Sequence, residues 1–238
     1  MLLKRIVLDI ETTGINKYNK YYYIGHKIIE IGAIEITNFN ITNNKFHSYI
    51  NPNRNVDKEA YNIHGIDNKL LYNKPLFSDI VDNFIKFIYK SELIIHNAKF
   101  DISFINYELN LINYKISNIK SICNIIDTLS LARKKFPGKK NNLDSLCDRF
   151  NINRENRNFH GALIDAILLA KVFLLLIKKQ SKILFETENS KKYDIILYKN
   201  NNNINYKLEN LIILKANKKE LNNHINLLNF IKIKYLNK

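Results

Sequence analysis

Two acidic residues interrupt the apolar, β-branched run near the start of the chain. Asp9 and Glu11 stand within residues 5–11 (RIVLDIE), and Thr12-Thr13-Gly14 ends the run. The pattern predicts a buried central strand, on which residues two apart project to the same face. Buried charge is costly unless it is paired or bound to a metal. The fold must therefore compensate two carboxylates, either by a salt bridge at a strand end or by Mg²⁺ or Mn²⁺, which oxygen ligands suit.

The rest of the chain up to residue 178 alternates between strand and helix patterns. Lys27–Thr37 and Lys45–Ile50 predict two strands around a turn at Asn43-Asn44, and Phe77–Lys90 has one apolar face, as in an amphipathic helix. The later elements are predicted as a strand over 93–96, a helix over 100–112, a short strand ending at 127, and helices over 128–136, 143–150 and 161–178. Three strands followed by strand–helix alternation predict an α/β domain with a mixed sheet covered by helices.

Glycine and proline are confined to the first two thirds of the chain. All six glycines and all three prolines lie before residue 162, and an Asn run occupies 200–203. We therefore predict a compact domain over 1–178, a linker over 179–206 and an appended segment over 207–238. No uncharged apolar run is long enough to span a membrane, and Cys123 and Cys147 lack metal-ligand spacing, so we expect a soluble protein of the cytoplasm.

The net charge of +15 has two interpretations. A basic chain can carry an electrostatic surface for nucleic acid. The abundant Asn, Ile and Lys residues are also those of A- and T-rich codons, so drift in an AT-rich genome would produce the same charge without selection for binding. The charge alone does not decide between them.

Two further acids occupy unusual places. The helix predicted over 162–177 is apolar almost all round, with only Asp165 and Lys171 charged, so it is expected to be buried. Asp165 then needs a cation, a metal or the helix N-terminus as its partner. His160 precedes it by five residues and could face the same place. Asp101 stands near the start of another predicted helix, where a capping role is the alternative.

Taken together, these residues form three sequence words in a fixed order. They are Leu8-Asp-Ile-Glu-Thr-Thr-Gly14, His96-Asn-Ala-Lys-Phe-Asp101 and His160-Gly-Ala-Leu-Ile-Asp165. The set resembles the DEDDh family of 3′→5′ exonucleases, over roughly residues 5–176. The resemblance implies a ribonuclease H-like fold, a mixed five-stranded sheet flanked by helices, to which this chain adds a C-terminal linker and partner-binding segment.

The same resemblance implies a set of functional residues. Two divalent ions, Mg²⁺ or Mn²⁺, would be held by Asp9, Glu11 and Asp165, with Asp101 completing the site through water. His160 would be the general base, since imidazole accepts protons near neutral pH. The residues implied to contact the terminal nucleotide are Asp9, Glu11, Thr12, Glu59, His64 and Asp165. By pattern alone, Glu59 is a helix-start acid, His64 a loop histidine and Asp127 a capping acid.

Three further sequence motifs indicate which branch of the family this chain resembles. His26–Ala33, Phe136–Lys139 and Asn142–Cys147 resemble the proofreading subunits of the bacterial replicative polymerase, DNA polymerase III. That branch implies a single-stranded or frayed DNA 3′ end as substrate and nucleoside 5′-monophosphates as products. It also implies a sliding clamp bound through 180–185, the polymerase III alpha subunit bound through 207–238, and a small theta-like third subunit.

Two other functions remain compatible with the sequence. An RNA-trimming member of the family, similar to RNase T or oligoribonuclease, would use the same acids. The chain could also act mainly as a structural polymerase subunit. For the tail, the alternative is an amphipathic helix that packs back on its own domain.

Overall fold

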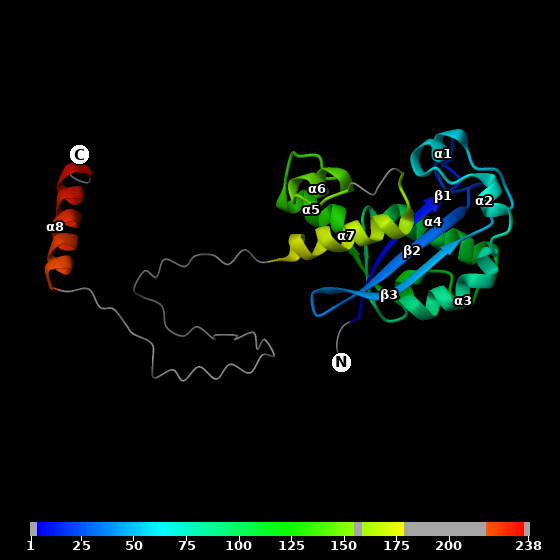
Figure 1. Cartoon of the computed structure of the whole chain (residues 1–238), viewed down its shortest axis with the longest axis horizontal. Coiled ribbons are helices and arrows are strands. Elements are labelled where there is room, and N and C mark those ends of the chain that lie inside the picture. Colours follow the sequence, from blue (N-terminus) through cyan, green and yellow to red (C-terminus); the bar gives the residue numbers. More distant parts are fainter. Residues whose placement is uncertain (1–3, 155–158, 179–217, 236–238) are drawn as a thin grey trace. The chain divides into compact units, whose positions relative to one another are not determined.

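The computed structural model describes residues 4–154, 159–178 and 218–235, with side chains described as far as residue 228 in the last range. The chain divides into two compact units, Met1–Lys182 and Ile183–Lys238. The first unit contains the sheet and the helices around it (Figure 1). None of the helices in the described ranges is long and apolar enough to cross a membrane.

A five-stranded sheet forms the centre of the first unit (Figure 1). Its strands are β1 (Arg5–Thr12), β2 (Ile28–Thr37), β3 (Asn40–Tyr49), β4 (Glu92–Ile95) and β5 (Asn124–Asp127). They lie in the order β3-β2-β1-β4-β5. The first three strands are antiparallel, whereas β4 pairs in parallel with both β1 and β5. The predicted mixed sheet is confirmed, and β1 is its central strand.

Helices connect and cover these strands. They are α1 (Lys58–His64), α2 (Asn68–Tyr72), α3 (Phe77–Ile88), α4 (Ala98–Leu111), the short 3₁₀ helix η1 (Ile119–Ser121), α5 (Thr128–Lys135), α6 (Leu143–Arg149), α7 (Ala162–Ile177) and α8 (Lys218–Tyr235). The larger helices match the predicted ranges to within two residues. For α1 the sequence predicts only a helix start at Glu59, which lies in its first turn. Helix α2 is not predicted, because its five residues show no extended apolar face.

The side chains of β1 alternate between two cores. Ile6, Leu8 and Ile10 pack into the larger core, which α3 and α4 cover. Val7 faces the other side of the sheet, where it packs with Ala166 and neighbouring residues of α7. Asp9 and Glu11 follow Val7 at intervals of two residues and therefore share the face that α7 covers.

The hairpin between β2 and β3 corrects the prediction of a turn at Asn43-Asn44. The turn is at Asn38 and Phe39, both with positive φ, between the paired residues Thr37 and Asn40. Asn43-Asn44 instead lies where the β2–β3 register is irregular. Two consecutive positive φ angles favour Asn and Gly, so a bulky Phe at the second position gave no turn signal, whereas the Asn pair did.

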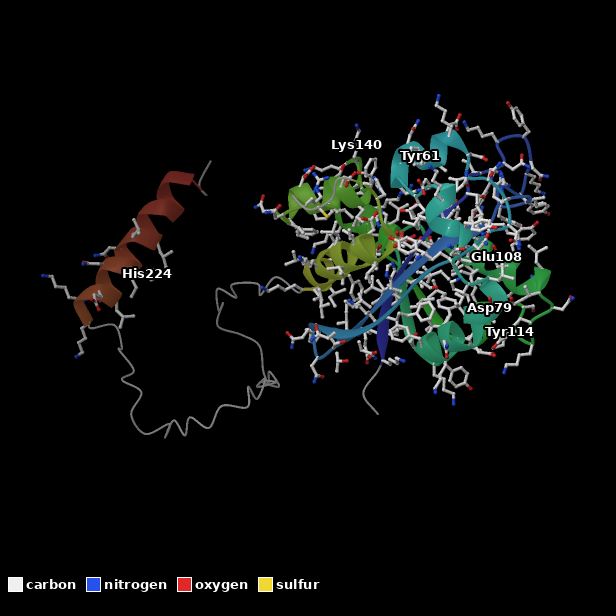
Figure 2. The ribbon with its side chains drawn as sticks, turned by 45° about the vertical axis from the view of Figure 1, so that its right-hand side comes forward. Tyr61, Asp79, Glu108, Tyr114, Lys140 and His224 are labelled. Carbon is white, nitrogen blue, oxygen red and sulfur yellow. The ribbon has the colours of Figure 1, made fainter. Side chains whose placement is uncertain are left out.

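Helix α4 is fastened to the start of β2 by a buried acid. Glu108, which is labelled in Figure 2, accepts hydrogen bonds from the backbone N–H of Ile28 (3.0 Å) and the Nζ of Lys27 (3.0 Å). Its carboxylate is thereby satisfied although the residue is only 2% exposed. This contact holds the helix that carries Asp101 against the sheet.

The second unit contributes α8 to the described structure. Every side chain described in this helix, from 218 to 228, is exposed. The predicted clamp-binding peptide 180–185, and residues 207–217 of the predicted polymerase-binding segment, lie outside the described residues.

Candidate active site

The end of β1 places the first two acids. Asp9 lies opposite Gly32 of β2, and Glu11 lies opposite Glu30. The β1–β2 register shifts immediately after Glu11, so that Thr12 pairs with Ile28. A bulge at such a point bends the strand and turns its side chains. Both acids are half-buried on the α7 face of the sheet.

The start of α7 brings the third acid and the histidine to the same place. Asp165 lies in the first turn and is buried, whereas the His160 side chain just before the helix is 42% exposed. His160 Nδ1 lies 3.1 Å from Asp165 Oδ2. The ligand atoms of Glu11, His160 and Asp165 all lie within 4.8 Å of one another. Residues from opposite ends of the domain sequence therefore converge.

Asp101 supplies the fourth carboxylate from the first turn of α4. It is buried, and burial raises its pKa to about 8, against the lowering effect of backbone hydrogen bonds at Asp101 and Ile10. Asn97 occupies the N-cap position of α4, and Asp101 follows in the first turn. Its carboxyl is hydrogen-bonded to its own backbone and to the backbone of Ile10, next to the acidic pair of β1.

The electrostatics of Asp9 show that the four acids share one site. Burial raises the pKa of Asp9 well above its usual range, and repulsion from Asp101, Glu11 and Asp165 raises it further. Like charges act this way only at short range. The sequence prediction that these acids meet is therefore supported by geometry and by charge.

This donor set fits divalent cations. Burial disfavours the charged forms of Asp9 and Asp101, and repulsion from the other acids adds to this effect at Asp9. Hard cations such as Mg²⁺ and Mn²⁺ prefer carboxylate oxygens, and they favour the ionised form that these residues otherwise resist. The chemistry of the donors does not distinguish the two metals.

A cavity of about 310 Å³ opens beside the acids. Its lining includes Glu11 and Thr12 at the end of β1, Glu59 and His64 of α1, and Phe100 of α4. Volumes of this order are typical of small-molecule sites. The residues predicted to contact a terminal nucleotide, Thr12, Glu59 and His64, thus line one pocket next to the carboxylates.

Local contacts explain how α1 reaches this pocket. The backbone N–H of Asp57 donates to the carbonyl of Thr13 (2.9 Å), which joins the start of α1 to the end of β1. Gly14 adopts φ +137°, and a Cβ there would lie 2.5 Å from the Asp57 carboxylate, so this junction requires glycine. The helix that carries Glu59 and His64 is therefore fixed relative to the acidic pair.

His64 differs from its prediction as a loop residue. It is the last residue of α1 and is buried. Its Nδ1 accepts a hydrogen bond from the backbone N–H of Ile66 (3.0 Å), and burial lowers its pKa. The ring is therefore neutral at physiological pH, with its proton on Nε2. At the pocket rim, Lys17 pairs with Glu59.

Two acids outside the four have other roles. Asp127 caps α5 by accepting from the backbone N–H of Leu129 (2.9 Å), which confirms the capping interpretation. Glu30 was not singled out from the sequence. It is buried on β2, its Oε2 accepts from the backbone N–H of Ala162 (3.0 Å), and it contributes to the raised pKa of Asp9. Its signal in the sequence is the same as that of Asp9, an acid inside an apolar strand.

Solved structures with the same fold are exonucleases. The nuclease domain of 3′hExo, a DEDDh family member bound to rAMP, aligns with a TM-score of 0.62 at 17% identity, covering 74% of this chain and 92% of that one. Exonuclease X, in complex with 5′ overhanging duplex DNA, aligns with a TM-score of 0.53 at 23% identity, covering 72% of this chain and 90% of that one. At these identities the likeness establishes the fold, which is the predicted one.

The sequence comparisons are more specific. Residues 6–173 match the family described as Exonuclease. The DNA polymerase III subunit epsilon of Buchnera aphidicola subsp. Baizongia pistaciae is 49% identical, over 96% of this chain and 92% of that protein. The Escherichia coli protein of the same name is 46% identical, over 79% of this chain and 76% of its own length. This chain therefore belongs to the exonuclease family and, within it, to the DNA polymerase III epsilon subunits.

Proposed function

We propose that this protein is the proofreading 3′→5′ exonuclease of a replicative DNA polymerase, and that it releases nucleoside 5′-monophosphates from a DNA 3′ end. The observation that carries the proposal is the position of the pocket. The pocket that holds Thr12, Glu59 and His64 shares Glu11 with the acidic cluster. A terminal nucleotide in the pocket would place its phosphodiester bond beside the carboxylates.

The acids serve as the cation-binding groups in this proposal. Asp9, Glu11 and Asp165 would hold two divalent ions, and Asp101 would complete the site through water. When bound, two such ions activate the attacking water and neutralise charge on the departing 3′ oxygen. The carboxylates' own contribution is to hold the cations, to which the reacting phosphate would bind. Burial raises the pKa values of Asp9 and Asp101, and repulsion from the other acids raises that of Asp9 further, so bound cations would favour the ionised form of both residues.

His160 serves as the general base. It is partly exposed beside Glu11 and Asp165, so it can reach a water that approaches the phosphate. Donation of Nδ1–H to Asp165 Oδ2 (3.1 Å) would leave the ring's lone pair on Nε2 and would hold the ring in one orientation. Nε2 would then take the proton from the attacking water.

Selection of a mispaired end needs no recognition of the mismatch itself. A terminal nucleotide must leave the duplex to enter the pocket, and an unpaired end does so at lower cost than a paired one. Phe100 and Thr12 both line this pocket, and Phe100 contributes apolar surface. Apolar surface does not distinguish one base from another, so the pocket would accept a frayed 3′ end of any sequence.

The partner proposal rests on α8 and on the relatives. Leu221, Ile225 and Leu228 lie on one face of this helix and are about half exposed. Relatives that carry the name DNA polymerase III subunit epsilon extend over the tail, as the 96% coverage by the Buchnera protein shows. We infer that residues 207–238 bind the polymerase alpha subunit. Binding of a sliding clamp by 180–185 and of a theta-like subunit remain predictions from the sequence.

The alternatives are less well supported. The RNA-trimming enzymes share the acids, but the relatives that cover the whole chain carry the polymerase name. A purely structural role would not require the acids, His160 and the pocket to converge as they do.

Product analysis on a 3′-labelled primer tests the proposal. The substrates are a paired and a mispaired DNA primer–template and the matching RNA, each with Mg²⁺ and with EDTA. We expect metal-dependent release of the terminal dNMP, faster from the mispaired DNA. Preference for RNA would move the protein to the RNA-trimming branch, and no cleavage of either would leave the structural role.

A further inference from the structure

The first turn of α7 lies directly on the backbone of β2. A Cβ atom at Gly32 would lie 2.2 Å from the backbone nitrogen of Leu163 and 2.3 Å from the carbonyl carbon of Ala162. Real Cβ contacts are not this short, so only glycine permits the approach. Gly32 is also the residue opposite Asp9. The absence of a side chain on β2 therefore sets the distance between α7 and the acidic end of β1.

Glu30 holds the same helix end from two residues away. The N-cap of α7 is Gly161, which has no side chain to accept a hydrogen bond from the first turn. Glu30 Oε2 accepts from the backbone N–H of Ala162 (3.0 Å), so β2 supplies the missing cap. Its other oxygen, Oε1, lies 2.7 Å from Nε2 of His47 on β3. Both oxygens of this buried carboxylate are thus engaged.

The buried position of the Glu30 carboxylate is energetically unfavourable without these two hydrogen bonds. It lies directly opposite Glu11, and like charges at opposed positions of an antiparallel pair repel each other. The positive end of the α7 dipole and the hydrogen bond between Glu30 and His47 offset that repulsion on the Glu30 side. Because its oxygens face Ala162 and His47, Glu30 is not arranged as a fifth metal ligand.

We propose that Glu30 is a positioning residue for the exonuclease site. By fastening the N-terminus of α7 over Gly32, it keeps Asp165 and His160 against Asp9 and Glu11. This inference rests on the proposed function, because it assigns Glu30 a role in keeping the side chains of that site in position. A cap that only stabilised the helix would affect the free energy of unfolding and nothing else.

Three variants of the full chain test the proposal. Glu30→Ala removes both contacts. Glu30→Gln keeps an acceptor for the N–H of Ala162 and an amide group that can hydrogen-bond with His47. Leu176→Ala is the matched control, since Leu176 is buried near the other end of α7 and its truncation destabilises the domain without touching the first turn.

Two measurements are made without DNA and one with it. The hydrogen-exchange rate of the Ala162 amide in EDTA reports the hydrogen bond to Glu30. Titration with Mn²⁺ gives the metal affinity, which depends on the relative positions of the carboxylates. Steady-state cleavage of single-stranded DNA separates kcat from KM. For Glu30→Ala we expect faster exchange at Ala162, weaker Mn²⁺ binding by about 10-fold, and a kcat lowered about 10- to 100-fold with KM within about threefold, as is typical when a supporting partner is lost.

The controls give these results their meaning. We expect Glu30→Gln to keep Mn²⁺ affinity and kcat within about threefold of the unmodified chain, and Leu176→Ala to lower the melting temperature without weakening Mn²⁺ binding. The proposal is overturned if Glu30→Ala binds Mn²⁺ normally. It is also overturned if Leu176→Ala, with a melting temperature as low as that of Glu30→Ala, weakens Mn²⁺ binding by the same factor. If the unmodified chain does not cleave DNA, the proposed function fails, whereas exchange at Ala162 and Mn²⁺ binding still test the role of Glu30.

Discussion

Helices α7 and α8 are of similar length but use their apolar residues in opposite ways. In α7 (Ala162–Ile177) most apolar side chains are buried, against the sheet and against α5 and α6. In α8 (Lys218–Tyr235) every described side chain is exposed, including Leu221 and Ile225. The first helix packs most of its apolar side chains within its own domain, whereas the second presents an apolar face that the described residues of its own unit do not cover.

The difference separates two functions within one chain. Burial fixes α7 rigidly, so its single acid, Asp165, can be held within a few ångströms of Glu11 and His160. The exposed apolar residues of α8 favour binding to a partner, because burial of an apolar face lowers the free energy. We therefore expect variants of the acid site and of α8 to affect different activities.

The largest effect is expected from Asp9→Ala. Exonuclease activity should fall to the level measured with EDTA, because a carboxylate that holds the cations is lost. The melting temperature in EDTA should stay the same or rise, since burial and the neighbouring acids make the charged form of Asp9 unfavourable. Cleavage assays and thermal unfolding measure both quantities.

The control for this variant is Asp148→Ala, which removes an exposed acid of α6 that pairs with Arg154. It should leave cleavage unchanged. Persistent Mg²⁺-dependent cleavage by Asp9→Ala would contradict the assignment of this residue to the metal site, and partner binding through α8 should be normal in both variants.

The next effect in size is expected from His160→Ala. Loss of a general base lowers kcat by about 10²- to 10⁴-fold, while Mn²⁺ binding by the acids should persist. His224→Ala is the matched control, because this histidine is exposed on α8 (Figure 2) and far from the acids in sequence. A loss of less than about fivefold in the His160 variant would show that the histidine is a bystander.

Much of this site could be predicted because its signals are local. An acid inside an apolar strand, as at Asp9, or inside an apolar helix, as at Asp165, violates the hydrophobic pattern and is visible without a structure. The same logic would have found Glu30, since it also interrupts an apolar strand. Its partner, however, is the backbone of Ala162, 132 residues away, which no local pattern indicates.

The errors in the fold have the same origin. The sequence predicts a turn at Asn43-Asn44 because Asn tolerates positive φ, whereas tertiary context imposes that conformation on Phe39. The sequence predicts a loop at His64 because α1 spans only seven residues and presents little periodicity. Strands and long helices bury enough apolar side chains to show a regular hydrophobic pattern in the sequence, whereas short helices and turns are too short to show one.

The apolar face of α8 gives the third prediction. Ile225→Asp places a charge between Leu221 and Leu228, where burial against the polymerase alpha subunit would leave it unpaired. We expect affinity for that subunit to fall by about 10- to 100-fold, with unchanged cleavage of single-stranded DNA. Surface plasmon resonance and the cleavage assay measure the two effects.

Asn223→Asp is the control, because it adds the same charge to the opposite face of α8. It should bind normally. Equal loss in both variants would mean that net charge, and not the apolar face, determines binding, and normal binding by Ile225→Asp would exclude this face as the interface.

The last expected effect concerns the pH dependence of stability, and not activity or partner binding, and it belongs to the buried acids. Burial raises the pKa of Asp101 to about 8, whereas an unfolded Asp titrates near 3.9. Between these values the metal-free folded state keeps a proton that the unfolded state has lost. The stability that this proton contributes is complete below about pH 4 and is lost as pH rises toward 8, by at most about 1.4 kcal/mol per pH unit. Because divalent cations bind the ionised form, their affinity should change in the opposite sense and increase with pH.

Thermal unfolding in EDTA between about pH 5 and pH 8.5 measures this effect, with Asp101→Asn as the comparison. The variant keeps the shape of the side chain but cannot ionise, so its melting temperature should fall less steeply as pH rises. Equal slopes in the two proteins would show that Asp101 does not titrate in this range. Because α8 has no buried acid among its described residues, Ile225→Asp should leave the slope unchanged. If the pH dependence of the melting temperature changes in Asp101→Asn and not in Ile225→Asp, it originates from a buried carboxyl of the first unit. The unfavourable burial of charge would then be confined to the domain that holds the acid site.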